Sequence, residues 1–325
     1  MFDLLFCILT LMRSLNPTSR SLGRGGTLVP STSRAPPHVS TQTSIQPVVI
    51  IGAARSGTNM LRDALSALPG STTWPCDEIN YLWRHGNART PHDELSPKQA
   101  TPRVRRYLRR QFAKQARHGA HVVEKTCANS LRVSFVDRVA PEAKFVSIVR
   151  DGRDAAASAR RRWHAKLEPG YAVAKARFVP PTDLPYYAAA HLGRRLHRLR
   201  SFDGRLGSWG PRLRDMDGLL ATRSLVEVCA VQWQRCVDLA DRDLAQLNSS
   251  RVHRVRYEDF VVDPAAHLAD IAAFAGQPAG DADVRAAISH VTPNRASAPR
   301  EQLSADEHAR IEALVERTLA AHGYG

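Results

Sequence analysis

Cysteine is scarce in this chain, and long apolar runs are missing. The five cysteines form no CxxC pair, which argues against a structural zinc site, and they are too few for a fold built on disulfides. Residues 2–12 are apolar except for Asp3 and Thr10. They are too few to cross a bilayer, and they lack the flanking positive charge and cleavage site of a signal peptide. Residues 13–45 are rich in Ser, Thr, Pro, Gly and Arg, so we expect residues 1–45 to be a disordered or targeting segment.

Acidic residues are also in deficit: 31 Asp and Glu stand against 46 Lys and Arg, a net charge of +15. A positive field suits an anionic ligand, although a basic surface without a specific role explains the charge equally well. The densest basic run, from Arg103 to Arg117, has the apolar spacing of an amphipathic helix with a basic outer face. It comes with no zinc-finger, helix-turn-helix or RNA-recognition signature, so we expect no nucleic-acid partner. A basic nucleic-acid-binding protein remains an alternative.

The most informative stretch is residues 47–63. A β-branched run, Val48–Ile51, ends at Gly52, and Gly57-Thr58 opens a segment with helical spacing. The N–H groups of such a turn and of the helix N-terminus point at an anion and can bind a phosphate. The spacing is that of a nucleoside-triphosphate loop, but the lysine before the hydroxyl residue is absent, and Arg55 and Ser56 lie inside the turn. We therefore expect phosphate binding without Mg-ATP chemistry, and keep a P-loop kinase or NTPase as an alternative.

Residues 144–158 repeat this arrangement. A second buried-strand run ends at Arg150, Asp151-Gly152 makes the turn, and Ser158 lies early on the next helix. The first motif, Gly-x-x-Arg-Ser-Gly-Thr, resembles the 5′-phosphosulfate loop of sulfotransferases, which use 3′-phosphoadenosine-5′-phosphosulfate (PAPS). The second resembles the 3′-phosphate element of the same family. An alternative is that Arg150 only caps the sheet edge and pairs with Asp151 or Asp154.

The hydrophobic pattern predicts an α/β fold. We expect a P-loop-like parallel sheet with helices on both faces, and one domain over residues 46–325 with an insertion at about 164–224. The insertion either faces the acceptor or is a surface excursion. Expected strands are 47–52, 121–124, 144–149 and 252–256. Expected helices are 58–68, 102–117, 130–139, 152–163, 225–246, 264–275 and 304–322.

The resemblance implies a PAPS-dependent sulfotransferase. Such an enzyme moves a sulfonyl group to a hydroxyl or amine acceptor by in-line transfer without a metal, and leaves 3′-phosphoadenosine-5′-phosphate (PAP). The acceptor class stays open among carbohydrate, peptide, lipid and small molecule. The resemblance assigns the donor to Arg55, Ser56, Gly57, Thr58, Asn59, Arg150, Ser158, Tyr257 and Arg295.

Two further residues are candidates for catalysis. Glu78, the candidate base, ends the segment Trp74-Pro75-Cys76-Asp77-Glu78, which is similar to the Cys-Gly-Glu-Glu segment of protein-tyrosine sulfotransferases. A carboxylate beside another carboxylate can have a raised pKa, which suits a base. Lys125, at the end of a predicted strand, would stabilise the leaving group. The alternatives are an ordinary loop carboxylate for Glu78 and an ion pair with Glu124 or Asp151 for Lys125.

Cys76 and Cys127 flank these two residues, and we expect them to lie near each other. A disulfide between them requires an oxidising compartment and a Cα separation below about 7 Å. We expect Cys229 and Cys236, seven residues apart, to pack on one face of a helix in the core. The sequence leaves the oligomeric state open, a homodimer included. We expect a cytoplasmic location, with the secretory pathway or membrane association through residues 2–12 as the alternative.

Overall fold

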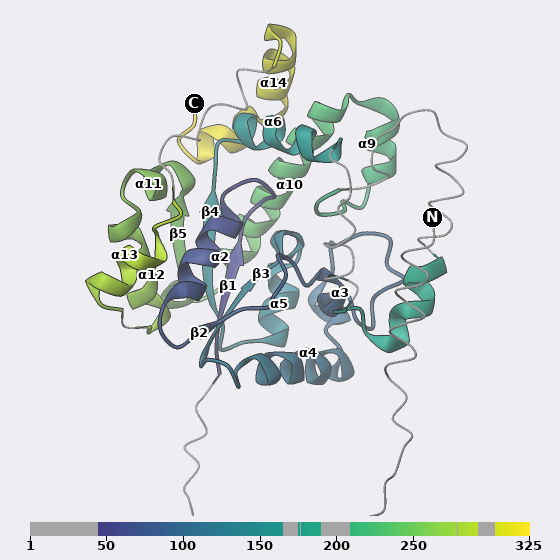
Figure 1. The fold of residues 1–325 in the computed structure, drawn as a ribbon. Coiled ribbons are helices and arrows are strands. Elements are labelled where there is room, and N and C mark those ends of the chain that lie inside the picture. The colour runs from purple at the N-terminus through teal and green to yellow at the C-terminus, as the bar shows by residue number, and fades with distance from the viewer. Residues whose placement is uncertain (1–44, 165–174, 176, 190–208, 278, 292–302) are drawn as a thin grey trace, which may run out of the picture.

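A parallel sheet of five strands forms the centre of the molecule, in the order β2-β3-β1-β4-β5 (Figure 1). The computed structural model describes residues 45–164, 175, 177–189, 209–277, 279–291 and 303–325. Because β1 lies between β3 and β4, the order of connection reverses beside it, and α/β proteins bind ligands at the carboxyl ends of strands at such a point. The strands are β1 (Gln46–Ile51), β2 (Ser71–Thr72), β3 (His121–Lys125), β4 (Lys144–Val149) and β5 (Val252–Arg256).

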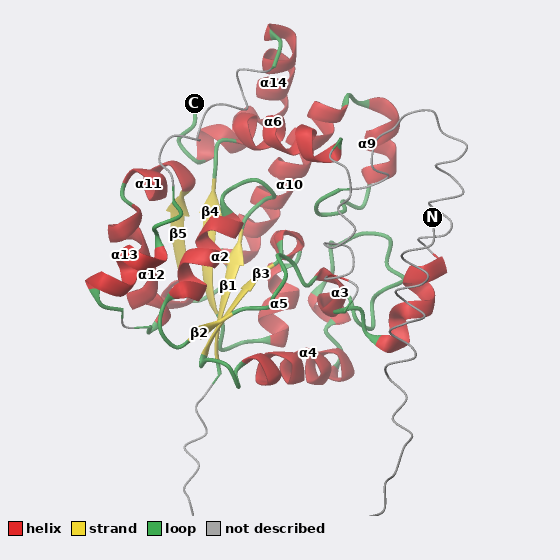
Figure 2. Ribbon diagram, in the orientation of Figure 1, coloured by secondary structure: helices red, strands yellow, loops and turns green. Residues whose placement is uncertain are grey.

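Helices flank this sheet, so the predicted fold class is confirmed (Figure 2). None of the helices in the described ranges has the length and apolar content needed to cross a membrane. The sequence analysis did not predict the short helices α3, α9, α11 and α13 of the described ranges, which are too short to show a helical repeat of apolar residues. The helices are α2 (Thr58–Ala67), α3 (Asn80–Trp83), α4 (Pro102–Gln115), α5 (Val133–Val139), α6 (Gly152–Trp163), α9 (Met216–Thr222), α10 (Leu225–Leu244), α11 (Tyr257–Val262), α12 (Pro264–Ala275), α13 (Asp281–Ala287) and α14 (Ala305–Ala321).

The central strand β1 shows how the two faces of the sheet are filled. Val48 and Ile50 belong to a core cluster with α2, α12 and α13, whereas Val49 and Ile51 belong to a cluster with α4 and α5. The split follows from the strand geometry, because successive side chains point to opposite faces. All four side chains are buried. A strand covered on both sides therefore appears in the sequence as an uninterrupted apolar run.

The ends of two helices follow the local signals in the sequence. Asp263 caps α12 by accepting the N–H of Ala266, and Gly276 ends that helix with a left-handed φ of 72°. Ser304 and Glu307 form the predicted capping box at the start of α14. Both helices therefore begin and end within one residue of the predicted positions.

One predicted helix is wrong in part. Residues 130–139 were expected to be one helix, but a 3₁₀ turn over Cys127–Leu131 comes first, and α5 begins only at Val133. The break falls at Arg132, whose backbone is not helical, with a φ of −153° and a ψ of 38°. Its side chain is buried at this point and donates to Asn129 and Asn80, so tertiary contacts override the local helical pattern.

A buried ion cluster ties distant segments of the chain together. Asp93 accepts from Arg84 at 2.7 Å and from the backbone N–H of Arg212 at 2.8 Å, and lies 3.7 Å from Nη1 of Arg132. Burial raises the pKa of Asp93, but the charges of Arg132 and Arg84 lower it more, and it lies below its ordinary value. The cluster therefore holds the chain after Trp209 against the segment that follows Glu78.

Replacing Asp93 by asparagine leaves Arg84 and Arg132 buried without their anion. We expect the free energy of unfolding to fall by about 3–5 kcal/mol. The control is Asp217→Asn, which removes a partner of Arg212 that is 84% exposed and should cost less than about 1 kcal/mol. Urea unfolding of both variants measures the difference, and equal losses would contradict a stabilising role for the buried cluster.

Candidate functional site

The loop between β1 and α2 contains two residues with a left-handed backbone. Arg55 has a φ of 73° and Gly57 a φ of 85°. This conformation is uncommon for a residue other than glycine and is found mostly where function requires it. It turns neighbouring N–H groups toward one side, and α2 begins directly afterwards at Thr58. The Ser56 hydroxyl is buried and has no hydrogen-bond partner among the described residues. The N–H groups of such a loop and the Ser56 hydroxyl are groups that can donate hydrogen bonds to an anion.

Gly57 must also lack a side chain because of what lies beside it. A Cβ at this position would be 2.5 Å from Cδ2 of Tyr257, the residue after β5. At Gly52 a Cβ would be 2.7 Å from the carbonyl oxygen of Ile148 in β4. The two glycines therefore let the loop pack directly against the ends of β4 and β5.

The second predicted turn, after β4, meets the first one. Arg55 Nε donates to Ser158 Oγ at 3.0 Å, and Arg150 Nη1 donates to the carbonyl oxygen of Arg55 at 3.2 Å. The Arg150 guanidinium also lies over the Tyr257 ring, 4.6 Å from its centroid, in a cation–π contact. Four residues predicted from separate parts of the sequence thus form one basic cluster.

Thr58 and Asn59, which were also predicted to bind PAPS, lie outside this basic cluster. Thr58 is buried, with Oγ1 3.5 Å from Cys127 Sγ, and Asn59 is exposed in the first turn of α2. Arg295 lies outside the described residues.

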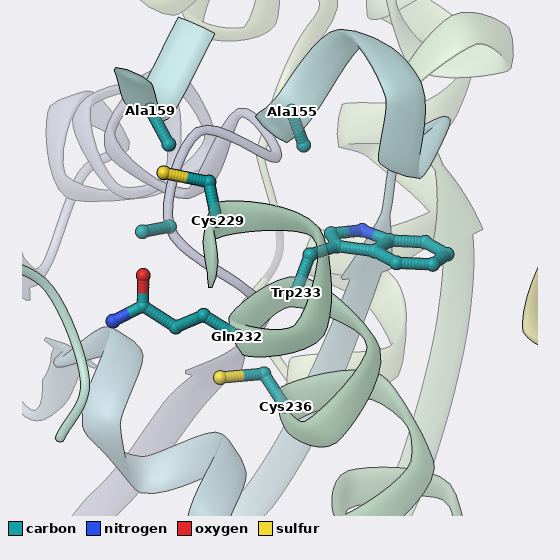
Figure 3. Close-up of a pocket in the computed structure, with 7 residues that line it drawn as sticks. Ala155, Ala159, Cys229, Gln232, Trp233 and Cys236 are labelled. Carbon is teal, nitrogen blue, oxygen red and sulfur yellow. The ribbon is translucent and has the colours of Figure 1, made fainter. Parts of the chain in front are cut away.

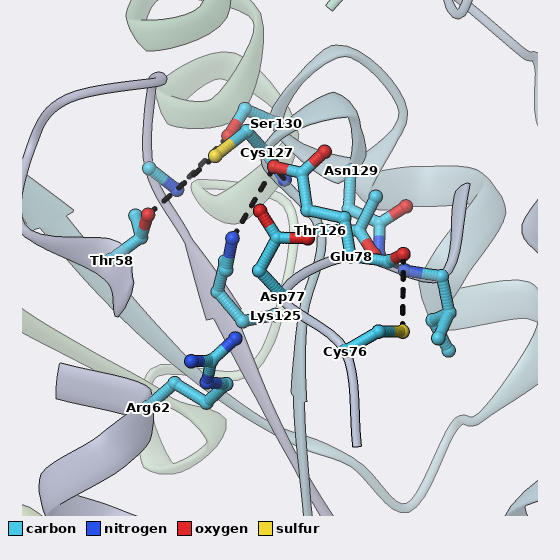
Figure 4. Close-up of polar contacts among 12 residues, drawn as sticks. Thr58, Arg62, Cys76, Asp77, Glu78, Lys125, Thr126, Cys127, Asn129 and Ser130 are labelled. Atoms are coloured by element: carbon cyan, nitrogen blue, oxygen red, sulfur yellow. Dashed lines mark hydrogen bonds and ion pairs between the residues drawn. The ribbon is translucent and has the colours of Figure 1, made fainter. Parts of the chain in front are cut away.

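Glu78 and Lys125 form an ion pair at the end of β3 (Figure 4). Lys125 Nζ lies 3.3 Å from Glu78 Oε1, and the same oxygen accepts the backbone N–H of Cys127 at 3.3 Å. The Lys125 side chain is 2% exposed and the Glu78 side chain 24%. The alternative partner Glu124 is instead buried and accepts from Trp83, Thr126 and Asn129.

The charge state of this pair differs from the expectation. Burial raises the pKa of Glu78, but Lys125 and then Lys175 lower it more, so that it lies below its ordinary value. Asp77 raises the pKa of Glu78 as predicted, but the two lysines outweigh it, so the expected net rise does not occur. Asp77 itself pairs with Lys175 at 3.3 Å. Burial lowers the pKa of Lys125, but Glu78 outweighs burial and raises it. Both groups are thus charged at neutral pH.

Cys76 and Cys127 both contact Glu78, through its backbone and its carboxylate respectively. Cys76 Sγ donates to the carbonyl oxygen of Glu78 at 3.5 Å, and Cys127 donates to its carboxylate through the backbone. Both cysteines are free thiols. Burial raises the pKa of Cys76 to about 11 and that of Cys127 to about 12, so both remain protonated at neutral pH.

Residues of the segment 164–224 contact the chain around Glu78. Lys175 pairs with Asp77, and Asp183 lies 2.9 Å from Nδ1 of His85. Tyr187 packs edge-on against Tyr81, with ring centroids 4.8 Å apart. Lys175, Asp183 and Tyr187 of this segment therefore lie against the chain between Asp77 and His85.

Sequence reasoning missed three residues that hold the two turns in place. Ser130 accepts the N–H of Gly52 at 3.0 Å, and Trp233 donates to the carbonyl oxygen of Arg150 at 3.1 Å. Glu258 accepts the N–H of Asp151 at 3.1 Å. Each partner is 78 to 107 residues away along the chain, so no short motif could have indicated these contacts.

A small cavity lies between Ala54, in the loop that joins β1 to α2, and the helices α6 and α10 (Figure 3). Its volume is about 10 Å³, which has room for about one water molecule, so it is a packing gap and not a substrate site. Cys229 and Cys236 line it from one face of α10 and are 2% and 1% exposed, which confirms their predicted place in the core. The lining residues are Ala54, Ala155, Ala159, Cys229, Gln232, Trp233 and Cys236.

Solved structures similar to this one include several sulfotransferases. The sulfotransferase domain of the Synechococcus PCC 7002 olefin synthase aligns over 88% of this chain and 98% of its own, at 16% identity and a TM-score of 0.48. A Mycobacterium avium sulfotransferase aligns over 85% and 76%, at 15% identity and a TM-score of 0.46. A mouse sulfotransferase in complex with PAP aligns over 86% of both chains, at 12% identity and a TM-score of 0.43. A comparison with curated proteins gave no significant match.

The family assignment comes from a sequence model of the sulfotransferase family. This model matches residues 47–209 and 215–281, which is more than half of the chain. The matched ranges include both strand-to-helix turns, the Glu78–Lys125 pair and Tyr257. The chain therefore belongs to the sulfotransferase family.

Proposed function

We propose that this protein transfers the sulfonyl group of PAPS to a hydroxyl or amine acceptor, and that PAP is the second product. The observation that carries the proposal is the contact between the two anion-binding turns. Arg55 of the first turn donates to Ser158 of the second, and Arg150 of the second donates to the carbonyl oxygen of Arg55. Adjacent anion sites of this kind suit a nucleotide that is phosphorylated at both its 5′ and its 3′ position.

In our proposal the two turns bind different parts of PAPS. The 5′ phosphosulfate lies in the first loop, against Arg55, Ser56, Gly57, Thr58 and Asn59. The 3′ phosphate binds Arg150 and Ser158, and the adenine stacks on Tyr257, with Arg295 as a further contact. The buried Ser56 hydroxyl supports this division, because the cost of a buried polar group without a partner is offset when a ligand oxygen pairs with it.

The chemistry requires one proton acceptor and one cation. The acceptor oxygen or nitrogen attacks the sulfur as the bond from sulfur to the bridging oxygen breaks, and that electron pair passes to the 5′ phosphate of PAP. Glu78 takes the proton of the acceptor, and Lys125 neutralises the charge that develops on the leaving oxygen. The 3.3 Å separation of their charged atoms supports a shared site for the two roles.

The ion pair links these two roles. As long as Lys125 lies against Glu78, its charge holds the pKa of the carboxylate below the ordinary range. When the ammonium turns toward the leaving oxygen, burial acts on Glu78 with less opposition and the pKa rises. Glu78 then becomes a stronger base at the stage at which a proton must be taken.

The insertion at about 164–224 is the proposed acceptor side of the site, within a sulfotransferase domain of residues 46–325. The contacts of Lys175 with Asp77 and of Asp183 with His85 support this placement, because they set the insertion beside the loop that carries Glu78. A screen of candidate acceptors with labelled PAPS would identify the chemical class of the acceptor.

The test of the proposal is a calorimetric titration of PAP into the full chain, with 5′-AMP and Mg-ATP as controls. We expect tight binding that depends on the 3′ phosphate. Arg150→Ala should weaken PAP by at least about tenfold and should weaken adenosine-5′-phosphosulfate, which lacks the 3′ phosphate, far less. A wild-type protein that binds PAP no better than 5′-AMP would refute the proposal, and equal losses for both ligands would refute the role of Arg150.

Glu78→Gln removes the proton acceptor but keeps the size of the side chain. We expect turnover to fall by about 10²–10⁴-fold, with PAP affinity within about twofold of wild type. Asp77→Asn is the matched control, since it makes the same change in the neighbouring carboxylate and should reduce turnover far less. Once an acceptor is known, single-turnover rates with labelled PAPS give the comparison, and unchanged turnover in Glu78→Gln would refute the base assignment.

Lys125→Met removes the largest influence that lowers the pKa of Glu78. Burial then dominates, and we expect that pKa to rise above its ordinary value. Lys175→Met should give a smaller rise, because Lys175 contributes less. The carboxyl ¹³C shift of Glu78, followed by NMR as a function of pH, measures both values. A pKa that stays low in Lys125→Met would show that the ion pair does not control this carboxylate.

A further inference from the structure

The chain turns sharply after α14 and returns toward the sheet. Gly323 has a left-handed φ of 71° and donates to the carbonyl oxygen of Ala320, and Tyr324 donates to that of Leu319. These two bonds are the Schellman arrangement, in which a glycine ends a helix and directs the next residue back toward it. As a result Tyr324 is only 6% exposed, although it is the penultimate residue of the chain.

The hydroxyl of Tyr324 lies between the ends of β4 and β5. It is 2.6 Å from Oε2 of Glu258, to which it donates, and 3.2 Å from the carbonyl oxygen of Val149. Burial and the hydrogen bond to Glu258 raise the pKa of Tyr324, so the hydroxyl keeps its hydrogen at neutral pH. The other carboxylate oxygen of Glu258 accepts the N–H of Asp151 at 3.1 Å. Tyr324 and Glu258 therefore bridge two strands beyond the last residues that pair in the sheet, Val149 and Arg256.

Two arginines hold Tyr324 in this position. Arg153 donates to its carbonyl oxygen at 2.8 Å and also contacts Asp151. The Arg256 guanidinium lies over its ring, 4.5 Å from the centroid. The residue is therefore fixed at its backbone, its ring and its hydroxyl.

The residues that this bridge touches are neighbours of the proposed nucleotide contacts. Val149 immediately precedes Arg150, and Glu258 immediately follows Tyr257. Arg150 and Tyr257 follow directly on the last paired residues of β4 and β5, Val149 and Arg256, and the Arg150 guanidinium lies 4.6 Å from the centroid of the Tyr257 ring. We propose that Tyr324 and Glu258 are positioning residues that set the distance between Arg150 and Tyr257 for a nucleotide with a 3′ phosphate. This inference rests on the proposed function.

Tyr324 lies beyond the part of the chain that the family model matches, which ends at residue 281. The C-terminal helix and its last turn thus contribute to the nucleotide site from outside the matched ranges. The bridge acts on Arg150 through the backbone of Val149 and Asp151. Loss of the bridge should therefore weaken binding of the 3′ phosphate more than binding of the 5′ phosphate.

The test compares PAP with 5′-AMP in the full chain. We expect Tyr324→Phe, which keeps the ring but removes the hydroxyl, to reduce the ratio of PAP affinity to 5′-AMP affinity by about tenfold. Glu258→Gln, which keeps an acceptor oxygen, should give an intermediate loss. Tyr107→Phe is the control, because it removes a tyrosine hydroxyl on α4, where the ring packs on His85. It should leave the ratio unchanged.

The outcomes separate positioning from stability. A ratio that stays at the wild-type value in both Tyr324→Phe and Glu258→Gln overturns the inference, even if the melting temperature falls. If Tyr324→Phe does not fold, the ratio for Glu258→Gln decides. A wild-type protein without a preference for PAP refutes the proposed function and the inference with it, whereas a wild-type preference that survives in the variants refutes the inference alone. In turnover, the KM for PAPS should rise more than kcat falls.

Discussion

The contact between the loop after β1 and the turn after β4 is the interaction on which the rest of the site depends. It exists because β1 and β4 pair in parallel, which brings both strand-to-helix turns to the same edge of the sheet. Arg55 then reaches Ser158 and Arg150 reaches the carbonyl oxygen of Arg55. Neither turn alone brings a basic side chain to both sides of one ligand.

Buried charged side chains have different effects in this sulfotransferase around Asp93 and in the Glu78–Lys125 pair. Asp93 lies between Arg84 and Arg132 and joins segments of chain, so its role is to hold the fold. Glu78 and Lys125 also form a pair, but the carboxylate is partly exposed and the ammonium is not. This partial exposure is consistent with our proposal that the pair at the end of β3 meets a ligand, whereas Asp93 is enclosed by its arginine partners.

Much of the fold could be predicted, because the central strands β1 and β4 are buried on both sides and appear as continuous apolar runs. Four strands and most helices lie within a few residues of their predicted positions. The two-residue strand β2 and the short helices were missed, since so few residues show no period. Arg132 broke a predicted helix because its side chain bonds to Asn80, a partner 52 residues away that no local pattern contains.

The amino-acid sequence by itself predicted the two strand-to-helix turns that we propose bind the donor, because glycines, a hydroxyl residue and an arginine after a buried strand act through the local backbone. It also identified Glu78 and Lys125 as candidates for catalysis. Only the tertiary structure decided their charge state, since the pKa of Glu78 depends on Lys125 and Lys175, which are far from it in sequence. The place of Tyr324 was decided in the same way, because a residue at the end of the chain gains its partners only when β4, β5 and α14 have packed together.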